Sequence, residues 1–369
     1  MSVGIVGLPN VGKSTLFNAL LKRQAALAAN YPFATIEPNV GIVDVPDNRL
    51  QVLADIVKKD FGERVGDRQI PGKIIPAVVK FYDIAGLVEG AHKGEGLGNA
   101  FLSHIRDVDA ILHVVRVFDD ENIARAGSVS PEDDRKTINT ELILADISTL
   151  EKRLQLFERE LKRDPSKENK EKQRLYQVLL DGLNKTILGS DIGFTNEEYK
   201  YLKDLNLLTL KPMLYVYNIS EDIMSSDVVH NADNDLETGI SVCAKFEEDL
   251  SMLPEDEKEG FLRGYNMSES GINVIVRNSY DLLNLQTFLT AGPKEVRAWT
   301  IKKGSKAPQA AGKIHSDFER GFISAEIINF DKLREAGSYK QAKEKGLIRK
   351  EGKDYVMKEG DVVEFHFSV

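Results

Sequence analysis

A glycine-rich stretch near the start of the chain carries residue types that bind phosphate groups. Residues Gly7 to Thr15 read G-L-P-N-V-G-K-S-T and fit the pattern G-x-x-x-x-G-K-[ST]. The glycines allow backbone N–H groups to converge on phosphate oxygens, and Lys13 adds a full positive charge for the outer phosphates. The loop residues that we expect to contact a nucleotide are Asn10, Val11, Gly12, Lys13, Ser14 and Thr15.

Residues in three separate parts of the sequence could bind Mg²⁺ beside those phosphates. Ser14 supplies a hydroxyl directly after the lysine. Asp83 begins a D-x-x-G pattern, in which the carboxylate can hold the metal and the N–H of Gly86 can sense a terminal phosphate. Thr35 lies in a loop, where a threonine is commonly only a turn residue, but together with Ser14 and Asp83 it is a candidate ligand. We therefore expect Ser14, Thr35 and Asp83 to bind the metal.

Strand and helix signals alternate around these residues. Apolar, β-branched runs at 2–6, 40–45, 77–83, 110–118 and 212–218 are typical of buried strands, and residues 16–22 have helical apolar spacing. This alternation predicts an α/β fold, a mostly parallel sheet covered by helices. The glycine-rich stretch then lies between a strand and a helix, where a phosphate-binding loop has to lie.

Almost a hundred residues separate the strands at 110–118 and 212–218, and this interval reads as long helices. Apolar residues recur there at steps of three and four in a charged background, which predicts helices with one apolar seam. A break near Pro165 indicates that the helices form an antiparallel coiled-coil hairpin. The alternative is a plain helical subdomain that packs against the core.

The remaining chain predicts more of the α/β layer and then a separate small domain. A strand at 239–245 and helices near 246–263 and 268–284 complete the layer, and strand-like runs separated by turns follow from Leu285. The expected division is a nucleotide-binding domain in two parts, 1–129 and 206–284, an inserted helical domain at 130–205, and an α+β domain at 285–369.

Composition favours a cytoplasmic protein. Hydrophobic residues make up 42% of the 369 residues, charged residues 29%, and no apolar run reaches membrane-spanning length. The chain passes from Met1 directly into a strand, so we expect no signal peptide, and a single cysteine excludes an intramolecular disulfide. The net charge is −9, but residues 292–369 hold 16 Lys and Arg against 12 Asp and Glu. That basic end is compatible with RNA or ribosome contact, or with a solvated surface.

The motifs together resemble one family of GTPases. G-L-P-N-V-G-K-S at 7–14, P-F-A-T-I-E-P-N at 32–39, D-I-A-G-L-V at 83–88 and G-E-G-L-G-N at 94–99 look like the Obg-related P-loop NTPases, and within them the YchF/OLA1 subfamily. The resemblance covers essentially the whole chain and implies a coiled-coil insertion and a C-terminal TGS domain. It also implies an ATPase that binds ribosomes.

The base-reading motif departs from that of a GTPase. GTPases carry N-K-x-D, whose Asp accepts two hydrogen bonds from guanine, whereas residues 218–221 here read N-I-S-E. Adenine lacks both of these donors, so an Asp at this position would stay unpaired and would disfavour adenine. Because the Asp is missing here, this penalty against adenine is absent. The resemblance implies a preference for ATP, with Asn218 and Ile219 beside adenine and an opposite wall formed by Ser241, Val242, Cys243 and Ala244. The alternative is that Glu221 still reads guanine from a shifted backbone.

The residue that usually activates water in GTPases is missing from this sequence. Ras-like enzymes place a Gln after the D-x-x-G glycine, but Leu87 stands there and cannot hydrogen-bond. The resemblance implies that a histidine substitutes, and His113 occupies the matching position, while His92 lies after Asp83. An isolated histidine in an apolar strand is commonly structural. The resemblance also implies that Asn10 could bind K⁺ in place of an arginine finger. Lys13, Gly86 and His113 are thus the catalytic candidates.

The sequence predicts a Mg²⁺-dependent ATPase that hydrolyses ATP slowly and whose nucleotide state controls ribosome binding. The alternatives are a GTP-specific ribosome-associated GTPase and an interaction scaffold in which hydrolysis is incidental. We expect a monomer whose partners are ribosomal subunits, through rRNA or ribosomal proteins, and no association with membranes or DNA.

Overall fold

A computed structural model of the chain describes residues 1–27, 39–65, 68–84, 97–119, 130–224 and 239–368. These residues form two compact units. The first comprises mainly Met1–Arg23 and Lys80–Ile275, and the second mainly Ile42–Val79 and Val276–Val369. Within the described ranges, no helix is both long and apolar enough to cross a membrane. Thr35, Gly86, Leu87 and His92 lie outside the described residues.

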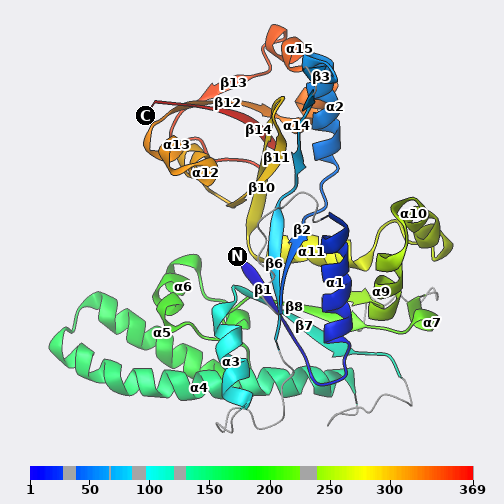
Figure 1. The fold of residues 1–369 in the computed structure, drawn as a ribbon. Coiled ribbons are helices and arrows are strands. Elements are labelled where there is room, and N and C mark those ends of the chain that lie inside the picture. Colours follow the sequence, from blue (N-terminus) through cyan, green and yellow to red (C-terminus); the bar gives the residue numbers. More distant parts are fainter. Residues whose placement is uncertain (28–38, 66–67, 85–96, 120–129, 225–238, 369) are drawn as a thin grey trace. The chain divides into compact units, whose positions relative to one another are not determined.

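A six-stranded sheet organises the first unit, with the strand order β2-β6-β1-β7-β8-β9 (Figure 1). The strand pairs β1–β6, β1–β7, β7–β8 and β8–β9 are all parallel, which confirms the predicted mostly parallel sheet. The strands are β1 (Ser2–Val6), β2 (Val40–Asp44), β6 (Val78–Asp83), β7 (Ala110–Arg116), β8 (Met213–Asn218) and β9 (Gly239–Val242). Every residue of β1 and β7 is buried, as expected for central strands with both faces covered.

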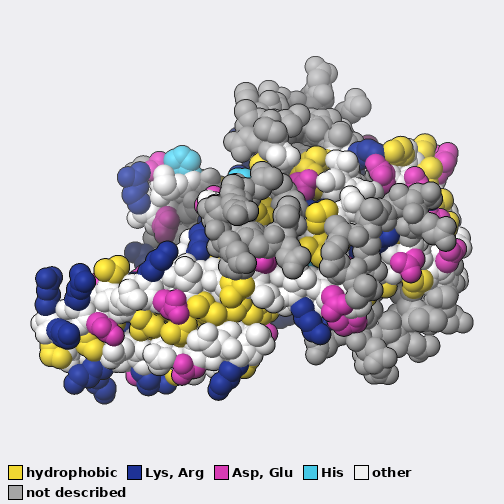
Figure 2. Space-filling model, turned by 90° about the horizontal axis from the view of Figure 1, so that it is seen from below, with side chains coloured by type: hydrophobic (Ala, Val, Ile, Leu, Met, Phe, Trp, Pro, Cys, Tyr) yellow, Lys and Arg dark blue, Asp and Glu magenta, His cyan; other side chains and the backbone are white. Residues whose placement is uncertain are grey.

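Two helices, α4 (Pro131–Arg163) and α5 (Lys167–Asn184), form the inserted hairpin and run side by side (Figure 1). The three residues between them include Pro165, which confirms the predicted break. With the shorter helix α6 (Asn196–Leu202), they enclose an apolar core that includes Leu150, Phe157 and Leu179. On the face shown in Figure 2, charged side chains lie along the hairpin among hydrophobic and other side chains.

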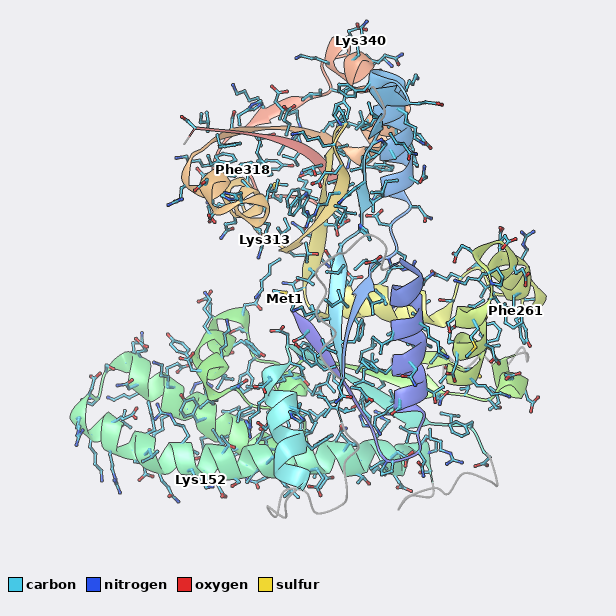
Figure 3. All side chains as sticks on the ribbon, viewed as in Figure 1. Met1, Lys152, Phe261, Lys313, Phe318 and Lys340 are labelled. Carbon is cyan, nitrogen blue, oxygen red and sulfur yellow. The ribbon has the colours of Figure 1, made fainter. Side chains whose placement is uncertain are left out.

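The predicted helix at 246–263 is wrong in one respect, because the structure has two helices there. Helix α9 (Ala244–Met252) ends before Pro254, which precedes α10 (Glu255–Gly264) and cannot continue a helix from the preceding turn. Phe261 of α10 stacks on Phe246 of α9, with ring centroids 5.1 Å apart (Figure 3). The other helices of this unit are α1 (Lys13–Leu27), α3 (Leu97–Asp107) and α7 (Glu221–Met224), and α11 (Gly271–Leu282) continues from this unit into the second.

The second unit is an α+β structure around another six-stranded sheet, in the order β13-β12-β14-β10-β11-β5. Its strands are β5 (Ile74–Ile75), β10 (Leu285–Ala291), β11 (Val296–Lys302), β12 (Phe322–Asn329), β13 (Arg349–Glu351) and β14 (Asp361–Phe367). Its helices are α2 (Arg49–Phe61), α12 (Ala307–Ile314), α13 (Ser316–Arg320), α14 (Phe330–Ala336) and α15 (Tyr339–Glu344). A small hairpin of β3 (Arg64–Val65) and β4 (Arg68–Gln69) completes the unit.

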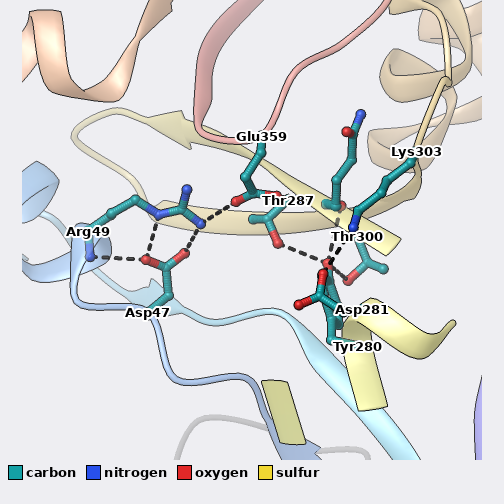
Figure 4. A network of polar contacts seen from close by, with 9 residues as sticks. Asp47, Arg49, Tyr280, Asp281, Thr287, Thr300, Lys303 and Glu359 are labelled. Atoms are coloured by element: carbon teal, nitrogen blue, oxygen red, sulfur yellow. Dashed lines mark hydrogen bonds and ion pairs between the residues drawn. The ribbon is translucent and has the colours of Figure 1, made fainter. Parts of the chain in front are cut away.

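Part of this second unit comes from early in the sequence. Strand β5 pairs with β11, and Arg49 at the start of α2 forms an ion pair of 2.6 Å with Glu359 (Figure 4). Asp47 holds the same guanidinium at 2.7 Å. Residues 42–79 are therefore an integral part of a unit that otherwise belongs to the C-terminal third of the chain.

Candidate functional site

The glycine-rich loop connects β1 to α1, and both of its glycines have a steric reason to be there. A Cβ on Gly7 would lie 2.6 Å from the carbonyl oxygen of Val114, on the neighbouring strand. Gly12 has a φ of +95°, and a Cβ there would collide with the side-chain amide of Asn218. The loop can take this path only with glycine at both positions.

Lys13 is buried at the start of α1, with 7% of its surface exposed. Its ammonium donates a hydrogen bond of 2.8 Å to the carbonyl oxygen of Leu8 within the same loop. Burial lowers the pKa of Lys13 to about 8, although the Asp83 carboxylate acts in the opposite direction. A phosphate group beside this ammonium would stabilise its charged form, so the position favours an anion.

Asp83, at the end of β6, has the properties of a metal ligand. The Ser14 hydroxyl donates to its Oδ2 at 3.4 Å, while its Oδ1 is buried and has no hydrogen-bond partner within the described ranges. Burial raises the pKa of Asp83, and the Lys13 charge and the Ser14 hydrogen bond lower it. A buried carboxylate oxygen without a partner, beside a hydroxyl, fits the oxygen-ligand chemistry of Mg²⁺.

Asn218, the last residue of β8, fastens the loop to the opposite side of the site. Its side-chain Nδ2 donates to the carbonyl oxygen of Val11 at 2.9 Å, and its Oδ1 accepts from the N–H of Ala244 at 3.0 Å. Its backbone carbonyl accepts from the N–H groups of Val117 and Phe118 at 2.9 and 3.1 Å. One asparagine therefore holds three segments together: the phosphate-binding loop, the end of β7 and the start of α9.

These segments surround a cleft of about 790 Å³, within the range usual for small-molecule sites. It brings together most of the residues predicted to bind a nucleotide: Asn10, Gly12, Lys13, Ser14, Thr15, Asn218, Ile219, Cys243 and Ala244. Val11, Ser241 and Val242 do not line it. Val11 and Val242 are buried, and Val11 contributes its carbonyl to the Asn218 bond.

Sequence reasoning missed part of the lining, namely Phe118, Asp119, Ser220, Asp222, Lys245 and Glu248. Phe118 was detectable, since it ends the apolar run around β7, and ligands of parallel sheets bind at the carboxyl ends of the strands. The Arg116 guanidinium lies over the Phe118 ring, 4.4 Å from its centroid. Glu221 also lines the cleft, and its carboxylate forms an ion pair of 3.2 Å with Lys245.

His113, the histidine proposed for catalysis, lies in the middle of β7 and does not line the cleft. It is fully buried against the Tyr215 ring, and neither ring nitrogen has a hydrogen-bond partner within the described ranges. Burial, followed by the charges of Arg135 and Lys13, lowers the pKa of His113 to about 3. The imidazole is therefore neutral at physiological pH, and its catalytic role stays a prediction.

The buried imidazole should make the protein sensitive to mild acid. An unfolded histidine has a pKa of about 6.5, so between pH 6.5 and 3 only the unfolded state binds this proton. The free energy of unfolding should fall with decreasing pH, by up to about 1.4 kcal/mol per pH unit from this group. Urea unfolding of the wild type and of His113→Phe between pH 7 and pH 5 should give a steeper slope for the wild type.

Parallel slopes for the two proteins would contradict this assignment, as would a His113 ring that titrates near pH 6 by NMR. The NMR measurement needs no variant and therefore does not depend on whether His113→Phe folds. The hydrolysis rate of the same variant, if it stays at the wild-type value, would overturn the catalytic prediction.

The chain matches two family models and is similar over its whole length to named bacterial proteins. Residues 2–145 match a family model described as "50S ribosome-binding GTPase", and residues 285–368 match the YchF GTPase C-terminal model, described as "Protein of unknown function (DUF933)". The chain is 48% identical to the "Ribosome-binding ATPase YchF" of Bacillus subtilis over 378 residues, which cover all of both chains. It is 46% identical to the protein of that name from Haemophilus influenzae, over 99% of each.

A solved structure is also similar over nearly the whole length. The Schizosaccharomyces pombe YchF GTPase superposes with a TM-score of 0.86 at 37% identity, covering 99% of this chain and 97% of the other. The likeness thus extends over the P-loop domain, the inserted helices and the C-terminal unit.

Proposed function

This chain belongs to the YchF family of P-loop nucleotide hydrolases, and on that premise we propose that it is a Mg²⁺-dependent ATPase. It hydrolyses ATP to ADP and phosphate, and its nucleotide state regulates its binding to ribosomes. The names of the bacterial relatives support this proposal, since they describe ribosome-binding ATPases. The observation that carries the choice of ATP is the ion pair between Glu221 and Lys245 in the cleft.

Guanine recognition requires a carboxylate that accepts hydrogen bonds from two guanine N–H donors. Glu221 is the carboxylate at the corresponding position, and Lys245 lies 3.2 Å from it. The Lys245 charge partly offsets the negative charge of the Glu221 carboxylate. The site therefore lacks the full negative charge that would stabilise bound guanine. The other residues on the base side, Ile219 and Cys243, place no carboxylate that adenine would leave unpaired.

Several residues of the site bind the phosphates or the metal ion in this proposal. The backbone N–H groups of the loop and the Lys13 ammonium bind the phosphate oxygens, and the N–H of Gly86 senses the terminal phosphate. Ser14, Asp83 and Thr35 would hold Mg²⁺, which supplies positive charge against the developing phosphate charge. Asn10, whose φ of +63° places it in the left-handed region, is the proposed contact for K⁺. Leu87 cannot orient water, so slow hydrolysis follows.

We assign residues 1–129 and 206–284 to the nucleotide-binding domain, 130–205 to the helical insertion and 285–369 to a TGS-like domain. The described stretch 42–79 folds with the last of these. We propose that the protein is a cytoplasmic monomer that binds ribosomal subunits and neither membranes nor DNA.

Competition between nucleotides tests the base preference. ATP should displace a fluorescent ATP analogue at a concentration at least about tenfold below that of GTP, since a guanine N–H donor that is desolvated without an acceptor costs about 1–3 kcal/mol. Lys245→Met should narrow this difference in displacing concentration severalfold, because it removes the positive charge beside the Glu221 carboxylate. Lys200→Met is the matched control, since Lys200 forms an exposed ion pair with Glu197 outside the cleft.

Stronger displacement by GTP than by ATP in the wild type would replace this proposal with a GTP-specific enzyme. If the ratio of the displacing concentrations of ATP and GTP is the same for Lys245→Met and the wild type, the ion pair does not affect the base preference.

A further inference from the structure

The far end of the α4–α5 hairpin presents positive charge in a protein whose net charge is negative (Figure 2). We call this end the basic tip and define it by five exposed cations within residues 159–170: Arg159, Lys162, Arg163, Lys167 and Lys170. Helical spacing places Arg159, Lys162 and Arg163 on one face of α4, and Lys167 and Lys170 on one face of α5.

The carboxylates of the same stretch form no ion pair with these cations, and three negative charges stand against five positive ones. Each of the three is bound to another group: Glu160 to Arg153 at 2.7 Å, Asp164 to the Asn169 amide at 3.0 Å, and Glu168 to Lys172 at 2.8 Å. None of the five cations forms an ion pair with any residue that the structure describes. Their charge therefore faces solvent.

Helix stability explains only some of these residues. Lys162 and Arg163 lie in the last turn of α4, where a cation interacts favourably with the helix dipole. Lys167 and Lys170 lie in the first turn of α5, where the dipole disfavours a cation. These two lysines lower the stability of the isolated helix. Lys167 is attracted to Glu171 without forming an ion pair with it, and an external anion would offset the remaining cost.

The turn between the helices is fixed by its own hydrogen bonds, which fix the backbone positions from which the cations project. The Ser166 hydroxyl caps α5 by accepting from the N–H of Asn169, and the Asn169 amide donates to the carbonyl oxygen of Asp164 at 2.9 Å. A rigid array loses less conformational entropy on binding than a flexible one.

We propose that the basic tip binds the phosphate backbone of ribosomal RNA. The choice of RNA as partner rests on the proposed ribosome-binding function, and the charge pattern supplies the chemistry. Residues 159–170 contain no aromatic side chain to stack on bases, so the tip contacts phosphates without reading sequence. They also lack the broad apolar face with which a helix enters a membrane.

The test compares a variant of the tip with a matched variant elsewhere in the inserted region. The tip variant carries Lys162→Gln, Arg163→Gln, Lys167→Gln and Lys170→Gln. The control removes the same charge from four exposed lysines outside the tip: Lys136→Gln, Lys152→Gln, Lys185→Gln and Lys203→Gln. Lys152, for example, projects from the middle of α4 (Figure 3). Thermal unfolding verifies that both variants are folded.

Affinity for purified, protein-free ribosomal RNA is measured at a series of KCl concentrations. The wild type and the control should show the same steep dependence of log K on log[salt], and the tip variant should show a slope smaller by about 3, because each phosphate contact contributes about 0.7–0.9. Its affinity in low salt should fall at least about tenfold. Equal slopes for the tip variant and the wild type would overturn the proposal.

Co-sedimentation with intact ribosomes separates this inference from the proposed function. If the tip variant leaves the ribosome but the wild type does not bind the purified RNA, the tip binds an acidic ribosomal protein and the RNA proposal is overturned. If RNA binding depends on the tip but no form sediments with ribosomes, the tip inference holds and the proposed ribosome-binding function fails.

Discussion

Lys13→Ala should lower ATP hydrolysis by at least about a hundredfold, a loss typical of removing one preorganised charge from the reacting phosphates. Lys13 is almost completely buried at the base of the cleft, so no solvent cation can take its place. The variant also leaves the Leu8 carbonyl oxygen without its donor. Steady-state and single-turnover phosphate release would measure the effect, and Lys152→Ala, on the outer surface of α4, is the control.

The same variant separates an enzyme that uses its nucleotide from a scaffold. If nucleotide state controls ribosome binding, the ribosome-bound fraction of Lys13→Ala should no longer differ between ATP and ADP. A wild type whose binding is already identical in ATP and ADP, and unchanged in Lys13→Ala, would favour the scaffold in which hydrolysis is incidental. A rate within severalfold of the wild type would contradict the role given to Lys13.

Asn218→Ala should weaken both nucleotide binding and folding. The substitution leaves the Val11 carbonyl and the Ala244 N–H without the partner that joins them, and each buried group that loses its hydrogen bond costs about 1–3 kcal/mol. We expect the free energy of unfolding to fall by about 2–4 kcal/mol. The affinity for ATP should fall about 10- to 100-fold, because Asn218 no longer fixes the position of the phosphate-binding loop relative to the start of α9.

Asn139→Ala is the matched control for this experiment. The Asn139 side chain donates to the Tyr215 hydroxyl at 3.0 Å, on the same strand that carries Asn218. Its removal should reduce stability while the ATP affinity stays near the wild-type value. Calorimetric titration with ATP and urea unfolding measure the two quantities, and equal losses of affinity in the two variants would show that Asn218 acts only through general stability.

Local sequence signals predicted those parts of the fold that local physics determines. The apolar runs of β1 and β7 and the break at Pro165 needed no knowledge of distant residues, and the structure confirms them. The division of 246–263 into two helices has a local cause as well, because Pro254 cannot donate a hydrogen bond to the preceding turn and so begins a new helix.

Other features depend on pairings between distant residues and could not be predicted in this way. The motif placed Asn218 beside the base, but its hydrogen bond to Val11, 207 residues earlier, follows from the direction of one side chain. Likewise, β5 is two residues long and has no recognisable pattern, so only its pairing with β11 assigns it to the second unit.

The two-part construction of the second unit has a consequence for protein synthesis. Residues 42–79 leave the ribosome about 200 residues before 276–369, a delay of roughly 10–40 s at 5–20 residues per second. During that time, the apolar face of α2, which includes Leu50, Leu53 and Val57, lacks the C-terminal strands and helices on which it packs. The nascent chain therefore passes through an interval in which a chaperone can bind it or it can aggregate, and this interval ends once β10, β11, α14 and α15, which pack on α2, have been synthesised.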